Sequence, residues 1–194
     1  MRRTMVVASW LLAGFVLPQA ELIAQDVDRS GMQGGRLRMR IGSDAEYLWF
    51  QDVLVRVGIS FGDGADSMSV LEFSARSGAG TPLHVHHTQD EIFHVLEGEV
   101  TWHVGDEDLK VGPGMTLRAP KGIPHYYRVT SPGGARWLAI TSGPDFEGFV
   151  RALARPAESP DLPPPMGPLR PEAMEGLKRA ARAHGIEVLG PPPR

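Results

Sequence analysis

The stretch of residues 78–98 contains four of the chain's seven histidines, and it constrains the fold more than any other segment. His84 and His86 are two positions apart, so on a β-strand both imidazoles point to the same face and form a clamp for a metal ion. The polar residues 87–90 are typical of a turn, which lets a new strand begin at Glu91. The stretch therefore predicts two strands joined by a turn, with the Glu91 carboxylate beside the two imidazoles.

A fourth metal-ligand candidate lies far downstream. Residues 120–124, Pro-Lys-Gly-Ile-Pro, predict a tight turn that leads to His125 at the start of an apolar run. Three imidazoles and one carboxylate form a mixed nitrogen and oxygen ligand set suited to iron, manganese, cobalt, nickel, copper or zinc. We therefore predict one divalent transition metal ion held by His84, His86, Glu91 and His125. The alternative is that these residues are ordinary polar side chains in turns.

Two motifs in this part of the chain resemble those of the cupin superfamily. They read Gly78-x5-His84-x-His86-x4-Glu91-x6-Gly98 and Gly114-x5-Pro120-x-Gly122-x2-His125. Residues 93–100 and 185–192 also resemble single-domain cupins similar to quercetin 2,3-dioxygenase, so the resemblance extends over about residues 36–192. One position departs from the second motif, because Val129 stands where the family usually has asparagine.

Short apolar runs separated by glycine- and proline-containing turns predict an all-β fold. The predicted strands are residues 36–41, 53–60, 68–73, 92–96, 100–104, 115–118, 126–130 and 136–141. Strands of this length and spacing, with no helix between them, are typical of a sandwich or barrel. The resemblance implies the cupin double-stranded β-helix, a jelly-roll-like barrel, and it also implies a homodimer.

The chain divides into three predicted parts. Residues 1–24 combine a basic flank with a short apolar run, which is typical of a signal peptide and predicts a periplasmic or secreted protein. The alternative for this run is an amphipathic or buried helix. Residues 36–155 are expected to form the barrel. Residues 156–194 are expected to form a proline-rich linker and a carboxy-terminal helix at 171–183, and a short helix is predicted at 145–153.

Composition excludes several classes of protein. The chain has no cysteine, which rules out disulfides, thiolate ligands and a thiol nucleophile. Its net charge of −3 gives no electrostatic footprint for nucleic acid. No segment other than the signal peptide suggests membrane insertion, so none is expected after its removal.

The remaining histidines and aromatic residues receive separate predictions. His87 is expected at the surface, and His94 and His103 are expected to be packed or at an interface rather than metal ligands. Phe93 is a candidate inward-facing residue of the barrel and a candidate for the substrate pocket. Tyr127 shares a strand face with the downstream histidine, so its hydroxyl is a second pocket candidate.

Three functions are consistent with these residues. The resemblance implies a metal-dependent dioxygenase that acts on a flavonol-like or other enolisable phenolic substrate with O2. In that family the glutamate is also the general base, which assigns the role to Glu91 and requires a carboxyl pKa raised by burial. The second possibility is a non-catalytic exported cupin that binds a small ligand or metal. The third is a manganese cupin acting on a small carboxylic acid such as oxalate, which requires a polar or cationic pocket.

Overall fold

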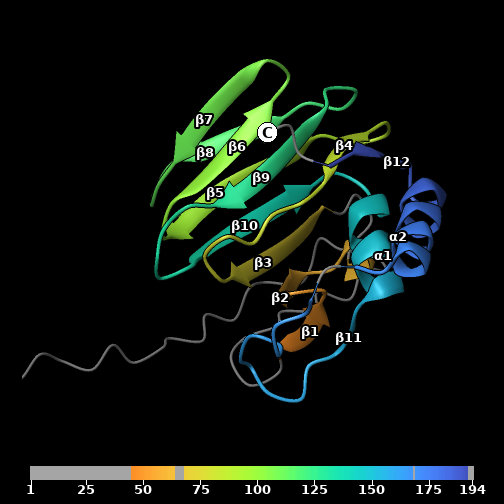
Figure 1. Cartoon of the computed structure of the whole chain (residues 1–194), viewed down its shortest axis with the longest axis horizontal. Coiled ribbons are helices and arrows are strands. Elements are labelled where there is room, and N and C mark those ends of the chain that lie inside the picture. The colour runs from red at the N-terminus through yellow and green to blue at the C-terminus, as the bar shows by residue number, and fades with distance from the viewer. Residues whose placement is uncertain (1–44, 64–67, 168, 192–194) are drawn as a thin grey trace, which may run out of the picture. The chain divides into compact units, whose positions relative to one another are not determined.

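The computed structural model describes residues 45–63, 68–167 and 169–191 (Figure 1). The predicted signal peptide at residues 1–24 and the predicted strand at residues 36–41 lie outside the described residues. Within the described residues, no helix is both long and apolar enough to cross a membrane.

Two antiparallel sheets form the framework, as expected for an all-β cupin barrel. The larger sheet has the order β11 (Arg155–Pro156), β1 (Glu46–Phe50), β2 (Val53–Ile59), β3 (Ser69–Ala75), β10 (Ala135–Thr141), β5 (Glu91–Glu97) and β8 (Thr116–Ala119). The smaller sheet has the order β12 (Ile186–Gly190), β4 (Leu83–His86), β9 (His125–Val129), β6 (Val100–Val104) and β7 (Glu107–Val111). A short 3-10 helix, η2, covers Phe61–Asp63.

The core lies between the two sheets and is rich in aromatic residues. Alternate residues of β5 and β6 are buried, among them Phe93, Val95 and Trp102. The Trp137 ring stacks on Phe73 at a centroid distance of 5.6 Å and meets Trp102 edge-on at 6.0 Å. Three partly buried residues also pack against this core: Val104, Leu117 and Tyr127. The period-two pattern of the strands therefore directs the large side chains into the barrel.

Both predicted helices are confirmed with their predicted bounds. α1 is Asp145–Leu153 and α2 is Pro171–Ala183, with a proline in the first turn of α2. Leu177 and Ala181 form the buried side of α2. α1 and α2 lie side by side, and α2 also contacts β12 (Figure 1). The helices thus cover the barrel at the end where β4 and β12 pair.

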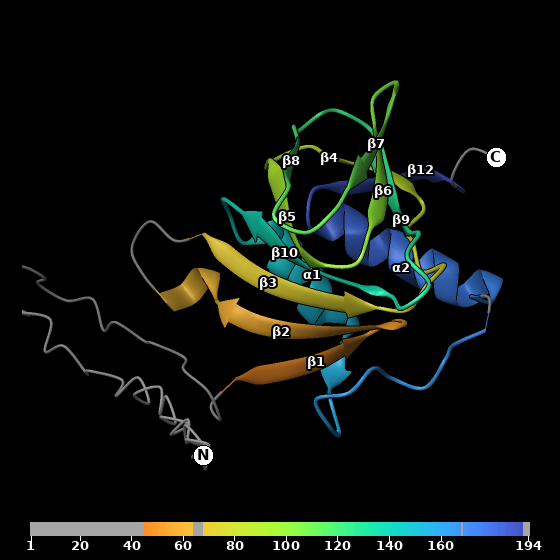
Figure 2. The same ribbon diagram turned by 90° about the vertical axis from the view of Figure 1, so that its left-hand side faces the viewer.

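The segment between β11 and α2 is rich in proline, and its described residues, 157–167 and 169–170, run past β1 (Figure 2) and are called the strap. The indole nitrogen of Trp49 donates a hydrogen bond to the Asp161 carbonyl at 2.7 Å. The backbone N–H of Met166 donates to Asp52 Oδ1 at 3.0 Å. The Arg155 guanidinium lies 4.4 Å from the centroid of the Trp49 ring. These contacts hold the strap against the β1–β2 hairpin.

Residues 156–194, which sequence patterns separate from the barrel, also supply a strand. β12 pairs with β4 in a register that places Ile186 opposite His86. β1, β7 and β12 were not predicted as strands. β7 has the sequence Glu-Asp-Leu-Lys-Val and lies at the edge of its sheet, where polar side chains are compatible with strand pairing.

Candidate metal centre

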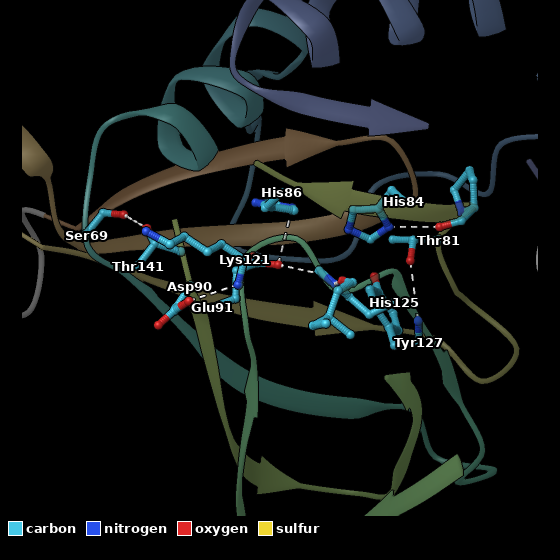
Figure 3. Close-up of polar contacts among 12 residues, drawn as sticks. Ser69, Thr81, His84, His86, Asp90, Glu91, Lys121, His125, Tyr127 and Thr141 are labelled. Carbon is cyan, nitrogen blue, oxygen red and sulfur yellow. Dashed lines mark hydrogen bonds and ion pairs between the residues drawn. The ribbon is translucent and has the colours of Figure 1, made fainter. Parts of the chain in front are cut away.

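The structure brings together the four predicted ligands, His84, His86, Glu91 and His125, which we call the His/Glu cluster (Figure 3). β4 supplies the first two histidines, β5 begins with the glutamate and β9 begins with the last histidine. One ligand atom from each residue lies within 4.8 Å of the others, and the cluster could therefore hold a metal ion.

Hydrogen bonds to Asp90 connect the segment that carries His86 and Glu91 to the turn that precedes His125. Asp90 Oδ1 accepts a hydrogen bond from the Lys121 N–H at 2.8 Å, and Oδ2 accepts one from Arg118 at 2.6 Å. These two interactions lower the pKa of the Asp90 carboxyl. The Gly122 N–H donates to the His86 carbonyl at 2.7 Å. The turn predicted at residues 120–124 is thereby fixed to the β4–β5 connection, and it delivers the downstream histidine to the cluster.

Backbone carbonyls orient two of the imidazoles. His84 Nδ1 lies 2.9 Å from the Pro82 carbonyl, and His125 Nδ1 lies 3.0 Å from the Ile123 carbonyl. Because a carbonyl can only accept, both Nδ1 atoms carry the proton and donate it. This arrangement leaves Nε2 of each ring directed to the cluster, as in histidines that bind metal through Nε2.

The centre of the cluster is short of hydrogen-bond partners. Glu91 Oε2 lies 3.0 Å from His125 Nε2, and 3.3 Å from His86 Nε2 without hydrogen-bond geometry (Figure 3). Among the described residues, Glu91 Oε1 and both ring nitrogens of His86 have no hydrogen-bond partner, although they are buried. Each unpaired buried polar group costs about 1–3 kcal/mol. A bound cation would satisfy Glu91 Oε1 and the unprotonated ring nitrogen of His86, so the residues present fit a metal ion.

The cluster shifts the pKa values of its own members. Burial, together with the neighbouring imidazoles, lowers the pKa of His84 to about 3. Burial also lowers the pKa of His86, whereas the hydrogen bond to Glu91 overcomes burial and raises the pKa of His125. Burial alone would raise the pKa of Glu91, but its interactions with His86 and His125 outweigh burial and lower that pKa to about 2. A general base was expected to have a raised carboxyl pKa, but the pKa of Glu91 is lowered in the protein without a metal ion.

A cavity of about 110 Å³ opens beside the cluster. The predicted pocket residues Phe93 and Tyr127 both line it, as do Trp102, Trp137 and Phe146. Burial raises the pKa of the Tyr127 hydroxyl, which therefore stays protonated at neutral pH. The walls are thus mainly apolar and rich in aromatic residues, and the His/Glu cluster lies at one part of them.

Sequence reasoning missed part of the cavity wall. Gln51, Asp52 and Leu177 also line it, and they come from the β1–β2 turn and from α2. Gln51 has φ of 53°, in the left-handed region that is uncommon for residues other than glycine. The Gln-Asp pair before the predicted strand at 53 was the available signal for a tight turn. The position of this turn at the cavity depends on tertiary packing, which the local sequence does not indicate.

The other histidines lie apart from the cluster. His87 is exposed and pairs with Glu187 at 3.1 Å, as expected for a surface residue. His94 bonds to Thr116 at 2.9 Å, and His103 bonds to an aspartate at 2.8 Å. None of these three belongs to the set of side chains that could hold a metal ion in the described residues.

Val129, the departure from the second motif, is part of the core. Its side chain is almost completely buried, and its N–H donates to the Ala79 carbonyl at 2.8 Å. Its own carbonyl accepts from the Gly78 N–H at 2.9 Å. The position therefore contributes packing and strand pairing, and its side chain offers the cluster no hydrogen bond.

Comparison with known proteins finds similarity in the central part of the chain. Residues 72–141 match the family model described as the cupin domain. Quercetin 2,3-dioxygenase of Bacillus subtilis (strain 168) is 30% identical over 80 residues, which cover 41% of this chain and 23% of the relative. An uncharacterized protein of Methanocaldococcus jannaschii is 35% identical over 57 residues, which cover 29% of this chain and 46% of the relative. The chain therefore spans less than half the length of either curated relative.

Two solved structures match part of the chain. The polyketide cyclase RemF from Streptomyces resistomycificus is 26% identical with a TM-score of 0.45, covering 53% of this chain and 77% of that one. The protein TT1209 from Thermus thermophilus is 31% identical with a TM-score of 0.39, covering 44% of this chain and 82% of that one.

Proposed function

From the cupin domain at residues 72–141 and the His/Glu cluster inside it, we propose that this chain is a metal-dependent dioxygenase. The proposed substrate is a flavonol-like or other enolisable phenolic compound, which reacts with O2. The observation that carries the proposal is the set of unpaired, buried ligand atoms at one end of an aromatic cavity. Perturbed titratable groups beside a cavity are a common feature of active sites. The similarity to a quercetin 2,3-dioxygenase supports the choice of substrate class.

The His/Glu cluster would hold one divalent transition metal ion. Such an ion, when bound, would favour the ionised form of a substrate hydroxyl and leave positions open for small ligands. His84 and His125 would bind through Nε2, because Nδ1 of each ring is committed to a backbone carbonyl. His125 would have to give up the proton that it shares with Glu91, so metal binding would release a proton.

Glu91 would accept the proton of the substrate hydroxyl. Its Oε1 atom has no hydrogen-bond partner among the described residues, whereas Oε2 is engaged by His125. The lowered pKa keeps the carboxylate ionised at neutral pH, which is the form that accepts a proton. Once His125 binds a metal ion, it would no longer form a hydrogen bond with the Glu91 carboxylate. The base role thus rests on the position of Oε1.

The aromatic walls would hold and orient a flat substrate. Phe93 and Trp102 stack at a centroid distance of 5.1 Å, and Phe146 lies 5.6 Å from the His86 ring. Stacked and edge-on contacts with aromatic rings favour planar ligands. The same walls exclude water from the cluster, which strengthens electrostatic interactions there.

The first test combines metal content with oxygen uptake. The protein is purified without a metal-binding tag, in parallel with a His125→Ala variant, and both are analysed for bound metal. We expect about one transition metal ion per wild-type chain, loss of that ion in the variant, and oxygen uptake with 3-hydroxyflavone by the wild type alone. A wild-type protein that takes up no metal after reconstitution would contradict the proposal.

A non-catalytic binding protein is the second candidate. Val129 in place of the motif asparagine favours it, because the valine side chain offers the cluster no hydrogen bond. In that case a ligand would raise the melting temperature without any oxygen uptake. A cupin acting on a small carboxylic acid is less well supported, because no lysine or arginine lines the cavity among the described residues.

A further inference from the structure

A second pocket lies between the proline-rich strap and the β1 side of the barrel. Its volume is about 450 Å³, against about 110 Å³ for the cavity beside the cluster. Trp49 and Arg155 form one wall, and residues 163–166 of the strap with Ala173 of α2 form another. We call it the outer pocket, and the cavity beside the His/Glu cluster the inner cavity.

The two spaces share part of their walls. Gln51 and Leu177 line both the inner cavity and the outer pocket. Gln51 lies in the β1–β2 turn, and the adjacent Asp52 is bound to the strap through the Met166 N–H at 3.0 Å. The turn backbone is therefore held in place by the strap. Gln51 and Leu177 are therefore the residues at which the two spaces adjoin.

The outer pocket is apolar and partly open to solvent. Leu153 and Met166 are 36% and 49% exposed, which is unusual for large apolar side chains gathered in one depression. Arg155 is the charged group of this pocket, and it lies over the Trp49 ring and pairs with Glu158 at 2.8 Å. Arg155 is paired with Glu158, and the remaining lining is mainly proline, leucine, methionine and Trp49, which offer an aromatic ring apolar surface.

The size of the inner cavity points in the same direction. Pockets for drug-sized ligands usually measure about 300–1,000 Å³. The inner cavity, at about 110 Å³, is well below this range, whereas the outer pocket, at about 450 Å³, lies within it. A substrate with more than one ring system would therefore need both spaces.

We propose that the outer pocket is a second subsite, which binds an aryl substituent of an elongated substrate whose enolisable hydroxyl reaches the His/Glu cluster. This inference rests on the proposed function for the identity of the reacting group. It adds that the strap and α2 select substrates by the ring attached to that group. The substrate class is thus an aryl-substituted enolone rather than a single small ring or a small acid.

The test compares two probes that differ only by a ring. 3-Hydroxyflavone and 3-hydroxychromone share the enolone head, and only the first carries a phenyl substituent. Their dissociation constants are measured without oxygen on the metal-loaded protein, for the wild type, Ala173→Trp and Ala183→Trp. Ala173 lines the outer pocket. Ala183 is an exposed residue of the same helix outside that lining, which makes it the matched control.

We expect the wild type to bind 3-hydroxyflavone about 10- to 50-fold more tightly than 3-hydroxychromone, because burial of a phenyl ring has that effect. Ala173→Trp should remove most of this difference in affinity. It should change the dissociation constant of 3-hydroxychromone by less than twofold. Ala183→Trp should change neither constant. A Met166→Ala variant, which only trims the pocket wall, should weaken 3-hydroxyflavone binding by several fold and keeps the test valid if the tryptophan variant folds poorly.

Other outcomes separate the subsite from the reaction. Equal binding of the two probes to the wild type, or no selective effect in either pocket variant, overturns the subsite. Oxygen uptake with both probes that is unchanged in Ala173→Trp leaves the proposed reaction standing and overturns the subsite. Selective binding without oxygen uptake on admission of air supports the subsite and contradicts the reaction. Failure of both probes to bind overturns both proposals.

Discussion

Two buried carboxylates in this molecule have opposite surroundings. Glu147, at the start of α1, is 4% exposed, and both of its oxygens are paired. It accepts from Ser60 Oγ at 2.6 Å, from the Phe61 N–H at 2.8 Å and from Arg151 Nε at 2.8 Å. Glu91, in the His/Glu cluster, is 2% exposed and has one oxygen without a partner among the described residues.

The difference distinguishes a structural carboxylate from one available to a ligand. Burying a charge is unfavourable unless hydrogen bonds and an opposite charge compensate. Around Glu147 the protein supplies that compensation, so the group ties α1 to the chain that follows β2. Around Glu91 the compensation is partial, which leaves an acceptor for a proton or a cation. The exposed fraction of the side chain does not distinguish the structural carboxylate from the available one, because it is similar for Glu147 and Glu91.

The largest expected effect is on turnover with an oxygen-consuming substrate. Glu91→Gln should lower kcat by about 10²- to 10⁴-fold, because loss of a general base has effects of that size. Glu147→Gln, the matched control, should keep kcat within a few fold. Metal analysis of both proteins accompanies the oxygen-electrode assay. Unchanged turnover in Glu91→Gln would show that the proton goes elsewhere.

The second effect is on stability and its dependence on metal. Glu147→Ala should lower the free energy of unfolding by about 1–3 kcal/mol, since it removes the acceptor of the hydrogen bonds from Ser60 and the Phe61 N–H, whereas Arg151 keeps its pair with Glu46. That loss should be the same with and without metal. In contrast, the cost of Glu91→Gln should increase by about 2–3 kcal/mol when metal is present near 100 times its dissociation constant, because the wild type alone gains full binding energy. Urea titrations in both conditions measure these values. A loss of stability in Glu147→Ala that depends on metal would contradict the distinction between the two carboxylates.

The third effect is on the pH dependence of the metal-free protein. The folded-state pKa of His84 is lowered from 6.5 to about 3, so the unfolded chain binds more protons between these pH values. Stability contributed by this group is present above pH 6.5 and is lost as the pH falls toward 3, by about 2 kcal/mol between pH 7 and pH 5. The lowered pKa of His86 acts in the same direction, and the raised pKa of His125 opposes it.

Denaturant titrations at pH 7 and pH 5 measure this loss. A His84→Gln variant provides the control, because its stability should vary less over the same interval. Glu91, with a folded-state pKa lowered to about 2, should add a further loss of stability only below about pH 4.5. A wild-type protein as stable at pH 5 as at pH 7 would contradict the neutral state of His84 in the folded protein.

The smallest effect is expected at His87, which is adjacent to a cluster histidine in sequence but is exposed. Its pair with Glu187 is an exposed ion pair, and such pairs contribute about 0–1 kcal/mol. His87→Ala should therefore keep the full metal content and change the free energy of unfolding by less than about 1 kcal/mol. Loss of metal from His87→Ala would mean that exposure does not distinguish surface histidines from metal-binding histidines.

Local sequence patterns were sufficient for several parts of this fold. The spacing of His84 and His86 and the turn before His125 predicted which side chains would meet, because strand periodicity and tight turns are local properties. The bounds of α1 and α2 followed from a regular apolar stripe and a proline at the start of α2. The departure at Val129 was visible in the sequence, but its burial in the core was not.

Features that depend on distant segments could not be predicted in this way. β7 is mostly polar, and β12 is short, so neither has a strong pattern of its own. Gln51 and Leu177 belong to a hairpin turn and a helix, and only tertiary packing makes them walls of the same cavity. The Glu91 pKa likewise depended on which neighbours were present, since burial and the imidazoles act in opposite directions.

The pairing of β12 with β4 has a consequence for the order in which the molecule assembles. β4, which carries two of the cluster histidines, has β12 along one edge and meets β9 through the pair of His84 and His125. During synthesis the chain emerges from its amino end, so β12 becomes available only after almost everything else. Pairing between segments so far apart is also slow. The strand that carries two of the cluster histidines would therefore gain its second neighbour only after β12 has been made, and the His/Glu cluster would reach its final surroundings only then.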